Sequence, residues 1–132
     1  MTEHGYSGKP LVEKLGIRLG HVVYVDGGPA HTAELLDGAP FTTRLPRHVD
    51  VTLLFTTRRS RLERRLPAVL ERTVTDGMVW VCWPKKASRV ATDVDESVVR
   101  EVALAVGVVD VKVAAVDATW SGLKLVRRLR DR

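Results

Sequence analysis

Cysteine, aromatic residues and long apolar runs are all scarce in this sequence. Cys82 is the only cysteine, so an intrachain disulfide is excluded and the cysteine count gives no sign of secretion. No apolar stretch approaches the length of a membrane span, and the N-terminus has no apolar signal core. We therefore expect a cytoplasmic protein that does not enter a membrane.

Metal ligands are scarce as well. A zinc site would depend on histidines and carboxylates, because one cysteine cannot supply a thiolate cluster. The histidines show no H-x-x-x-H spacing; they stand at His4, His21, His31 and His48. The sequence predicts no metal site.

The composition that remains is typical of one soluble globular domain. The chain has 132 residues, of which 45% are hydrophobic and 28% charged. A chain of this length buries roughly two-thirds of its unfolded surface, which is enough for a core without disulfides or metals. Valine is the main apolar residue and favours strands, because its branched Cβ suits a pleated sheet. We predict one domain over 1–132, with a loose N-terminal arm at 1–9 and a basic tail at 128–132.

Apolar runs alternate with helical patterns along the chain. The predicted strands cover 21–26, 49–55, 78–83, 108–117 and 123–127, with residues 41–45 as a further short edge strand. The predicted helices cover 10–16, 30–36 and 60–74, and a fourth begins at Asp93 or Asp95 and ends at Gly107. Strands that alternate with helices imply right-handed crossovers. The predicted fold class is a three-layer, Rossmann-like α/β fold, with a mostly parallel sheet of five to six strands and a C-terminal antiparallel hairpin.

Local signals around the third helix give sharper expectations. Ser60 and Glu63 have the spacing of a capping box. Pro67 lies inside the helical pattern, where its ring and missing N–H should kink or split the helix. Asp76-Gly77 predicts a turn before the strand at 78–83.

Polar loops follow the carboxyl ends of the predicted strands. In a parallel sheet these loops meet at one edge, where open α/β sheets bind their ligands. Hydroxyls, charges and aromatic rings that converge there suit an anionic or aromatic ligand. The candidate ligand-binding residues are Trp83, Lys85, Lys86, Ser88, Thr92, Asp93, Asp26, Thr56, Thr57 and Trp120.

The loop after Pro84 carries two open alternatives. Lys85 and Lys86 are either exposed loop cations or point charges that bind phosphate or carboxylate. Ser88 and Thr92 either bond to a ligand or close turns.

The three tryptophans divide in a similar way. Trp80 and Trp83 point to opposite faces of their strand, and Trp83, at the strand end, is the better candidate for stacking on a ligand. Trp120 is predicted in a turn, where it either stacks on a ligand or covers the open end of the core.

The strand at 21–26 ends without a complete nucleotide fingerprint. Gly27-Gly28-Pro29 lacks the third glycine of G-x-G-x-x-G, and the proline removes a backbone donor. No acidic residue ends a well-formed second strand to hold a ribose; Glu34 falls in a helix and Asp37 in a turn. The cofactor therefore stays unidentified.

Nucleophilic catalysis has little support. Ser88, His31 and Asp93 supply the residue types of a triad, but Ser88 is in no G-x-S-x-G elbow. Cys82 is in mid-strand, so we expect it to be buried and inert. The sequence assigns no catalytic residue.

Several motifs together resemble one known family. They are Gly5-Tyr6-Ser7-Gly8, Pro10-Leu11, Lys14-Leu15-Gly16, Trp80-Val81, Trp83-Pro84-Lys85-Lys86-Ala87-Ser88, Val98-Val99-Arg100-Glu101, Val109-Asp110-Val111-Lys112-Val113 and Thr119-Trp120-Ser121-Gly122-Leu123-Lys124. The chain resembles an uncharacterised bacterial family of short Rossmann-like proteins (domain of unknown function thirty fifty-two), and more distantly the class I methyltransferase fold. The resemblance implies a fold and a site location, and no activity.

The formal net charge of +5 comes from clustered cations. They stand in three runs, at 58–65, 85–89 and 127–132. Three functions stay open. The first, and the main prediction, is non-catalytic binding of an anionic small molecule or nucleotide at the sheet edge, and the other two are its alternatives. The second is a degenerate methyltransferase-like enzyme, and the third is nucleic-acid or protein binding through the basic helix and tail, which the interleaved Glu63 and Glu71 disfavour. A homodimer through a sheet edge is a further expectation.

Overall fold

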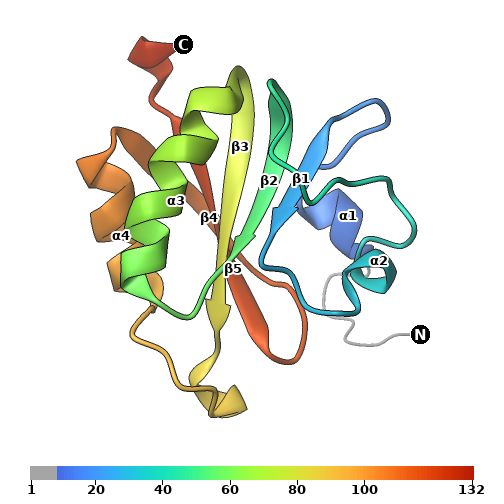
Figure 1. Ribbon diagram of the computed structural model, residues 1–132, viewed down its shortest axis with the longest axis vertical. Coiled ribbons are helices and arrows are strands. Elements are labelled where there is room, and N and C mark those ends of the chain that lie inside the picture. Colours follow the sequence, from blue (N-terminus) through green and yellow to red (C-terminus); the bar gives the residue numbers. More distant parts are fainter. Residues whose placement is uncertain (1–8) are drawn as a thin grey trace.

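Five strands form one sheet in the order β1-β2-β3-β5-β4 in the computed structural model, which describes residues 9–132 (Figure 1). The strands are β1 (Val23–Asp26), β2 (Val49–Phe55), β3 (Thr73–Pro84), β4 (Val108–Ala115) and β5 (Trp120–Arg127). β1, β2 and β3 are parallel neighbours, whereas β5 is antiparallel to both β3 and β4. The fold is therefore α/β with a mixed sheet, and only its first half is parallel. The predicted C-terminal hairpin is present as β4–β5.

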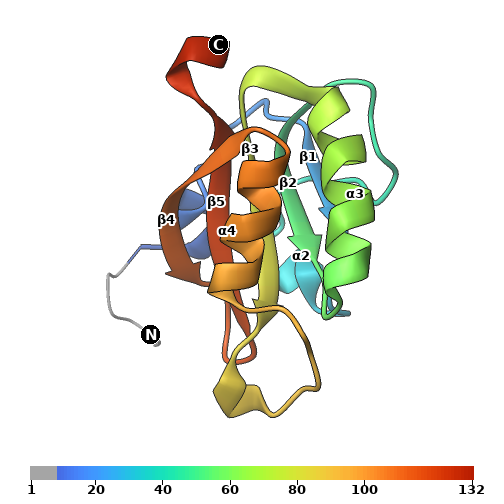
Figure 2. The same cartoon turned by 90° about the vertical axis from the view of Figure 1, so that its left-hand side faces the viewer.

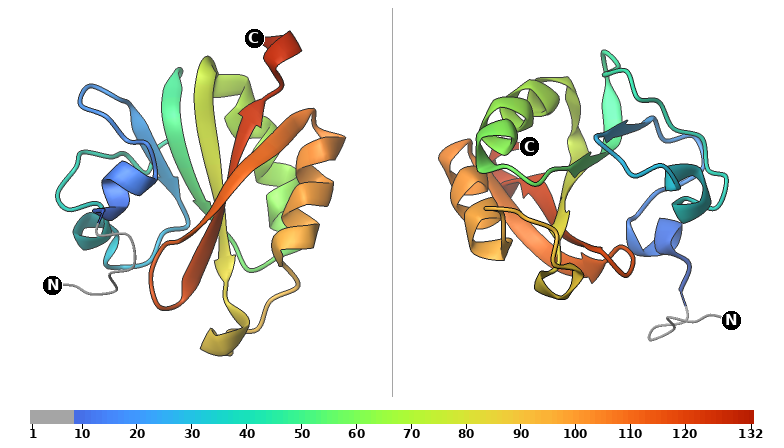
Figure 3. Two further views of the ribbon diagram at one scale, coloured as in Figure 1. Left: turned by 180° about the vertical axis from the view of Figure 1, so that it is seen from behind. Right: turned by 60° about the horizontal axis from the view of Figure 1, so that its bottom comes forward.

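Helices lie on both faces of the sheet. The α-helices are α1 (Leu11–Lys14), α2 (Thr32–Leu35), α3 (Arg59–Arg72) and α4 (Glu96–Ala105), and the 3-10 turns are η1 (Lys86–Ser88) and η2 (Leu129–Asp131). Figures 2 and 3 show α3 and α4 side by side on one face, with the short α1 and α2 on the other face over the β1 half of the sheet. Of the predicted arm at 1–9 and the Gly5–Gly8 motif, only Lys9 belongs to the described residues.

Alternation along β3 divides the core into two clusters. Val81 and Trp83 pack with α3 and α4, whereas Trp80 and Cys82 pack on the α1 and α2 side. Trp80 is fully buried, and its Nε1 donates to the Leu15 carbonyl oxygen at 2.9 Å. A strand that is covered on both faces is mostly apolar, which explains the apolar run from Met78 to Trp83 in β3 and the five apolar residues among the seven of β2.

The start of α3 corrects the predicted capping box. The helix begins at Arg59, so Ser60 lies inside its first turn and Arg58 occupies the N-cap position without a side-chain cap. The Arg59 N–H instead donates to Asp93 Oδ1 at 2.7 Å. A carboxylate 34 residues away in the sequence thus satisfies a donor that local spacing had assigned to Ser60.

The helix α3 also runs through Pro67 without a break. Pro67 is on the exposed side of the helix, whereas Leu62, Leu66 and Val69 are buried against the sheet. Packing of this buried stripe keeps the helix continuous despite the lost backbone hydrogen bond.

The predicted turn at Asp76-Gly77 is wrong, because β3 begins earlier, at Thr73. Val49 pairs with Thr73 and Val51 with Met78, so the chain makes an irregular excursion between these two pairs. A Cβ on Gly77 would lie 3.0 Å from the Asp50 carbonyl oxygen. The glycine therefore permits a bulge inside the strand instead of a turn before it.

Other boundaries also differ from the prediction. Residues 41–45 make one bridge, between Tyr24 and Thr42, and no strand. β5 begins at Trp120, so the hairpin turn comes earlier than predicted. Asp117 Oδ1 causes this shift, because it accepts hydrogen bonds from the backbone N–H groups of Thr119 (2.8 Å) and Trp120 (2.7 Å).

No helix among residues 9–132 is long and apolar enough to cross a membrane.

Candidate functional site

The carboxyl ends of β1, β2 and β3 meet at one end of the molecule, the lower end in Figure 1 and the near end in the right-hand view of Figure 3. The loops after these strands carry most of the predicted site residues. Two hollows open along this edge, one beside β1 and one beside the loop after β3.

The first hollow, called here the β1 pocket, has a volume of about 420 Å³. Glycines shape its floor. Gly27 has φ +69°, and a Cβ there would lie 2.7 Å from the Phe55 carbonyl oxygen; a Cβ on Gly28 would lie 2.6 Å from Thr32 Oγ1. Only glycine fits at both positions, because the protein's own atoms fill the space that a side chain would need. The lining residues are Val25, Asp26, Gly27, Gly28, Pro29, Ala30, Thr32, Ala33, Phe41 and Thr43.

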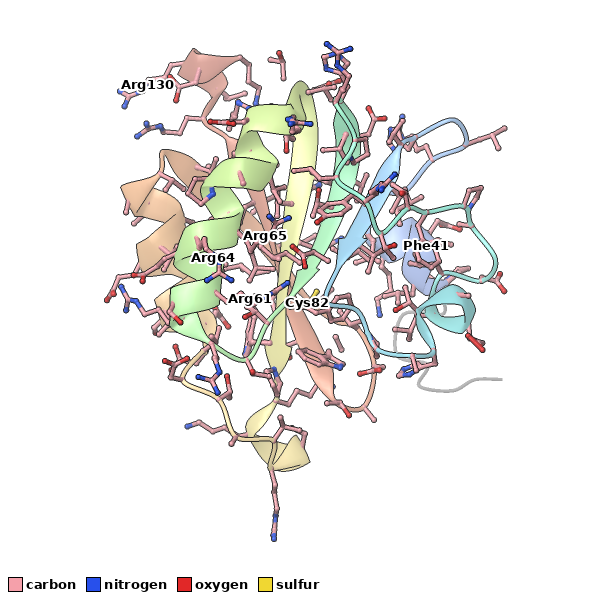
Figure 4. The ribbon with its side chains drawn as sticks, in the orientation of Figure 1. Phe41, Arg61, Arg64, Arg65, Cys82 and Arg130 are labelled. Carbon is pink, nitrogen blue, oxygen red and sulfur yellow. The ribbon has the colours of Figure 1, made fainter. Side chains whose placement is uncertain are left out.

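Asp26, which ends β1 and borders this pocket, is held by two arginines of α3. Its carboxylate pairs with the Arg61 guanidinium and accepts from Arg65 Nε at 2.7 Å, and Arg65 also donates to the Tyr24 hydroxyl. Figure 4 labels both arginines on α3. Burial raises the pKa of Asp26, but the Arg65 hydrogen bond and Arg61 outweigh it, so the pKa falls below its ordinary value. Asp26 is therefore an ionised structural anchor with little capacity left for a ligand.

The second hollow, called here the loop pocket, has a volume of about 710 Å³. Its one aromatic wall is Trp83, which is only 7% exposed and belongs to the core. The lining residues are Trp83, Pro84, Lys85, Lys86, Arg89, Val90, Ala91, Thr92, Asp93, Val94, Asp95, Glu96 and Ser121.

The acidic side chains of the loop pocket have partners within the protein, whereas two of its basic side chains have none among the described residues. Asp93 accepts from the Arg59 N–H, Asp95 caps α4 through the Val98 N–H, and Glu96 pairs with Arg100. The side chains of Lys86 and Arg89 have no hydrogen bond or ion pair within the described part of the chain. The free charge of the pocket is therefore positive.

The hydroxyls expected to face a ligand close local turns instead. Thr56 Oγ1 donates to the Arg58 carbonyl oxygen and accepts from its N–H, and Ser88 Oγ donates to the Lys85 carbonyl oxygen at 2.6 Å. Thr92 Oγ1 donates to the Thr57 carbonyl oxygen at 2.7 Å. These contacts correspond to the turn-closing alternative.

His31 and Asp117 form a contact that was not predicted from the sequence. His31 Nε2 lies 2.9 Å from Asp117 Oδ2, joining the loop after β1 to the β4–β5 turn. Lys85 Nζ donates to the Asp117 carbonyl oxygen at 2.7 Å, so this predicted ligand cation is already engaged. His31 and Asp117 are both in loops that follow predicted strands and were expected to meet at this edge. That expectation was the only indication of the contact in the sequence.

The triad of Ser88, His31 and Asp93 is not assembled. Each of the three has a different partner: Ser88 bonds to the Lys85 carbonyl, His31 to Asp117, and Asp93 to the Arg59 N–H. Cys82 is buried, and burial, followed by the nearby charge of Asp117, raises the pKa of its thiol far above the ordinary value. Within residues 9–132 no three histidine, cysteine or acidic side chains gather as a metal site would need.

Trp120 covers one end of the core. Its ring meets Phe55 edge-on, with centroids 5.1 Å apart, and it packs against the cluster on the α1 and α2 side. This contact corresponds to the core-covering alternative, although the ring is half-buried and keeps some exposed surface.

Comparison with known proteins places the fold among methyltransferases. No family model and no curated protein sequence matches the chain. Among solved structures, magnesium protoporphyrin IX methyltransferase from Synechocystis PCC 6803, with bound SAM, is similar at a TM-score of 0.60 and 13% identity over 89% of this chain and 74% of that one. A ribosomal protein L11 methylase from Lactobacillus delbrueckii subsp. bulgaricus has a TM-score of 0.61 and 9% identity over 89% and 75% of the two chains.

The mitomycin 7-O-methyltransferase is similar as well, at a TM-score of 0.62 and 12% identity. The match covers 83% of this chain and half of the other. At such low identity the likeness shows a methyltransferase-like fold and does not transfer an activity.

Proposed function

We propose that this protein is a small, degenerate methyltransferase-like enzyme that binds S-adenosylmethionine in the β1 pocket. The position of the pocket carries the proposal, because it lies at the carboxyl end of β1 and is lined by the glycine turn of Gly27 and Gly28. Open α/β sheets bind ligands at this place, and the similarity to methyltransferase structures supports the same assignment.

The residues of the β1 pocket fit an adenosyl group in part. A volume of about 420 Å³ falls within the range of small-molecule sites. The Phe41 ring and Thr43 hydroxyl supply an apolar wall and a hydrogen-bonding group. The ligand itself would supply a methyl group bound to a cationic sulfur.

Within the described residues, the pocket lacks a free carboxylate for two parts of S-adenosylmethionine, namely the ribose hydroxyls and the positively charged sulfur. Between β1 and β2 the described chain has α2 and one bridge, so no second strand brings a carboxylate to the ribose hydroxyls. Asp26 cannot take that role while Arg61 and Arg65 hold it. We therefore expect weak binding, at a Kd of roughly 0.1–1 mM.

Isothermal titration calorimetry with S-adenosylmethionine tests this proposal. Ala33→Trp places a bulky side chain in the β1 pocket from an exposed position of α2. Ala91→Trp is the matched control, because it places the same side chain in the loop pocket from an exposed position. Binding that Ala33→Trp removes and Ala91→Trp leaves intact is the expected result. Wild-type protein that gives no heat at millimolar ligand would rule the proposal out.

Anion binding in the loop pocket is a second candidate, and the free charges of Lys86 and Arg89 favour it. Arg89 adopts φ +61°, which is uncommon for a residue with a side chain and often marks a functional loop. In this function the pocket holds a phosphate or carboxylate without catalysis. Inorganic phosphate should raise the melting temperature of wild-type protein, and the Lys86→Ala/Arg89→Ala variant should lose this shift.

Nucleic-acid binding by the basic helix has less support. Arg59, Arg61 and Arg65 are engaged with carboxylates of the same chain, which lowers the charge offered to a phosphate backbone. Arg130 lies at the end of the molecule opposite to the site (Figure 4). Membership of the uncharacterised Rossmann-like family also remains a proposal, supported by the Trp83–Ser88 and Thr119–Lys124 motifs.

A further inference from the structure

His31 is positioned at the border of the β1 pocket. Its neighbours in sequence, Ala30 and Thr32, both line the pocket, while its side chain extends to the β4–β5 turn. The side chain is 53% exposed, so solvent and small molecules reach the ring.

Asp117 is fixed from several directions. Its Oδ1 accepts the N–H groups of Thr119 and Trp120, its carbonyl oxygen accepts from Lys85, and its Oδ2 faces His31. Burial raises the pKa of Asp117, but the Trp120 N–H, followed by His31 and the Thr119 N–H, lowers it further than burial raises it. The carboxylate is therefore ionised at neutral pH and acts only as an acceptor.

An acceptor at Oδ2 determines the tautomer of the neutral imidazole. The proton must be on Nε2, which leaves the lone pair on Nδ1. Nδ1 has no hydrogen-bond partner within residues 9–132. The unengaged basic nitrogen of this edge is thus held in one orientation by a carboxylate.

We propose that His31 is the proton acceptor of this site and that Asp117 is its positioning residue. In the reaction, the substrate accepts the methyl group through the oxygen or nitrogen of an O–H or N–H group. His31 Nδ1 takes the proton of that group as the oxygen or nitrogen bonds to the methyl carbon of S-adenosylmethionine. The bond from carbon to sulfur breaks, and its electron pair stays on sulfur. This role rests on the proposed function, and it assigns as substrate a molecule with an acidic O–H or N–H.

Long-range proton–nitrogen NMR of the labelled full chain tests the tautomer directly. In its neutral form, His31 should carry its proton on Nε2. His21 is an internal reference, because its Nδ1 accepts the Arg18 N–H at 3.0 Å and its proton must also be on Nε2. Asp117→Asn should give a mixture of tautomers at His31 and leave His21 unchanged.

Diethyl pyrocarbonate, which modifies accessible basic imidazoles, gives a second readout. His31 should react faster than the exposed His48, and Asp117→Asn should reduce the rate at His31 to that of His48. His31→Gln, which keeps a donor toward Asp117 without a basic nitrogen, should retain the calorimetric affinity of the wild-type protein.

The outcomes separate the two proposals. A chain that binds S-adenosylmethionine but carries the His31 proton on Nδ1, or in which His31 reacts no faster than His48, overturns this inference alone. A chain with the expected tautomer that binds no S-adenosylmethionine overturns the proposed function, and the acceptor role with it.

Discussion

Asp26 shows how one residue can be structural at the place where a ligand group was expected. Two arginines of α3 converge on its carboxylate at the end of β1, and Arg61 also donates to the Phe55 carbonyl oxygen at 2.9 Å. The network joins the helix to two neighbouring strands. It therefore fixes the floor of the β1 pocket without offering a charge to it.

Asp26→Asn should destabilise the protein by about 2 kcal/mol at neutral pH, because two partly buried guanidinium groups lose their charged acceptor. The folded pKa of Asp26 is below its unfolded value, so its contribution is complete above about pH 4 and is lost as pH falls through the folded pKa. Urea unfolding at neutral and acidic pH measures both effects.

Asp110→Asn is the matched control for this prediction. Its pKa is also lowered, by the Arg100 hydrogen bond, but the pair lies at the surface. It should cost less than about 1 kcal/mol. Equal losses in the two variants would contradict the anchoring role of Asp26.

Cys82 should be unreactive in the folded protein. Its thiol is fully buried, and burial raises its pKa so that thiolate is negligible at neutral pH. Iodoacetamide should label it only in denaturant, as followed by mass spectrometry. Labelling of the native protein at the rate of a free thiol would show that this part of the core opens.

At the scale of elements, the loop between β3 and α4 is tied to the starts of two helices. Asp95 caps α4 through the Val98 N–H at 2.9 Å, and Asp93 accepts the first N–H of α3. Thr92 adds a bond to the Thr57 carbonyl. The loop pocket is consequently bordered by capped helix ends, which limits how far this loop can move.

Asp95→Ala and Asp93→Ala should each cost about 1 kcal/mol, although only Asp95 belongs to the helix that it caps. Thermal unfolding of each variant measures the loss. Asp131→Ala, which removes a surface pair with Arg128, is the control and should change little. If Asp93→Ala matches this control, Asp93 does not cap α3.

Element positions were easier to predict from the sequence than their ends. β2 was predicted over its observed range because five of its seven residues are apolar, which is typical of a strand covered on both faces. The capping box predicted at Ser60 is wrong because that prediction considers only neighbouring residues, whereas the carboxylate that bonds to the start of α3 comes from Asp93. Trp120 was predicted in the turn, but it begins β5 because its backbone N–H donates to the Asp117 side chain. No sequence pattern reveals this contact.

The candidate site follows the same division. The predicted parallel direction of the strands placed their loops at one edge, and the loops after β1, β2 and β3 lie there. Which side chains stay free was not predictable, because hydroxyls such as Ser88 and Thr92 choose between a ligand and a nearby backbone carbonyl only in three dimensions. The pairing of His31 with Asp117 across 86 residues also depends on the folded sheet.

At the scale of the whole molecule, β4 is an edge strand whose features discourage pairing. The register shifts between Asp110 and Lys112, which leaves Val111 in a bulge, and Lys112 is exposed. Bulges and edge lysines are common protections against strand addition. These features disfavour a homodimer that forms by pairing of two β4 strands.

Lys112→Val should promote self-association, since it removes the charge from an edge that also carries the half-exposed Val111 and Val113. It also relieves repulsion with Lys124, which lies directly opposite on β5. Sedimentation velocity should show larger species for the variant than for the wild-type protein. Unchanged sedimentation at high concentration would mean that the bulge alone protects the edge.

The place of β5 in the sheet has a consequence for synthesis. β5 follows β4 in the sequence but lies between β3 and β4, and it pairs with both. A nascent chain that ends after β4 therefore has two separate pieces of sheet with no strand to join them. Residues up to Arg127 must therefore leave the ribosome before this sheet can be completed.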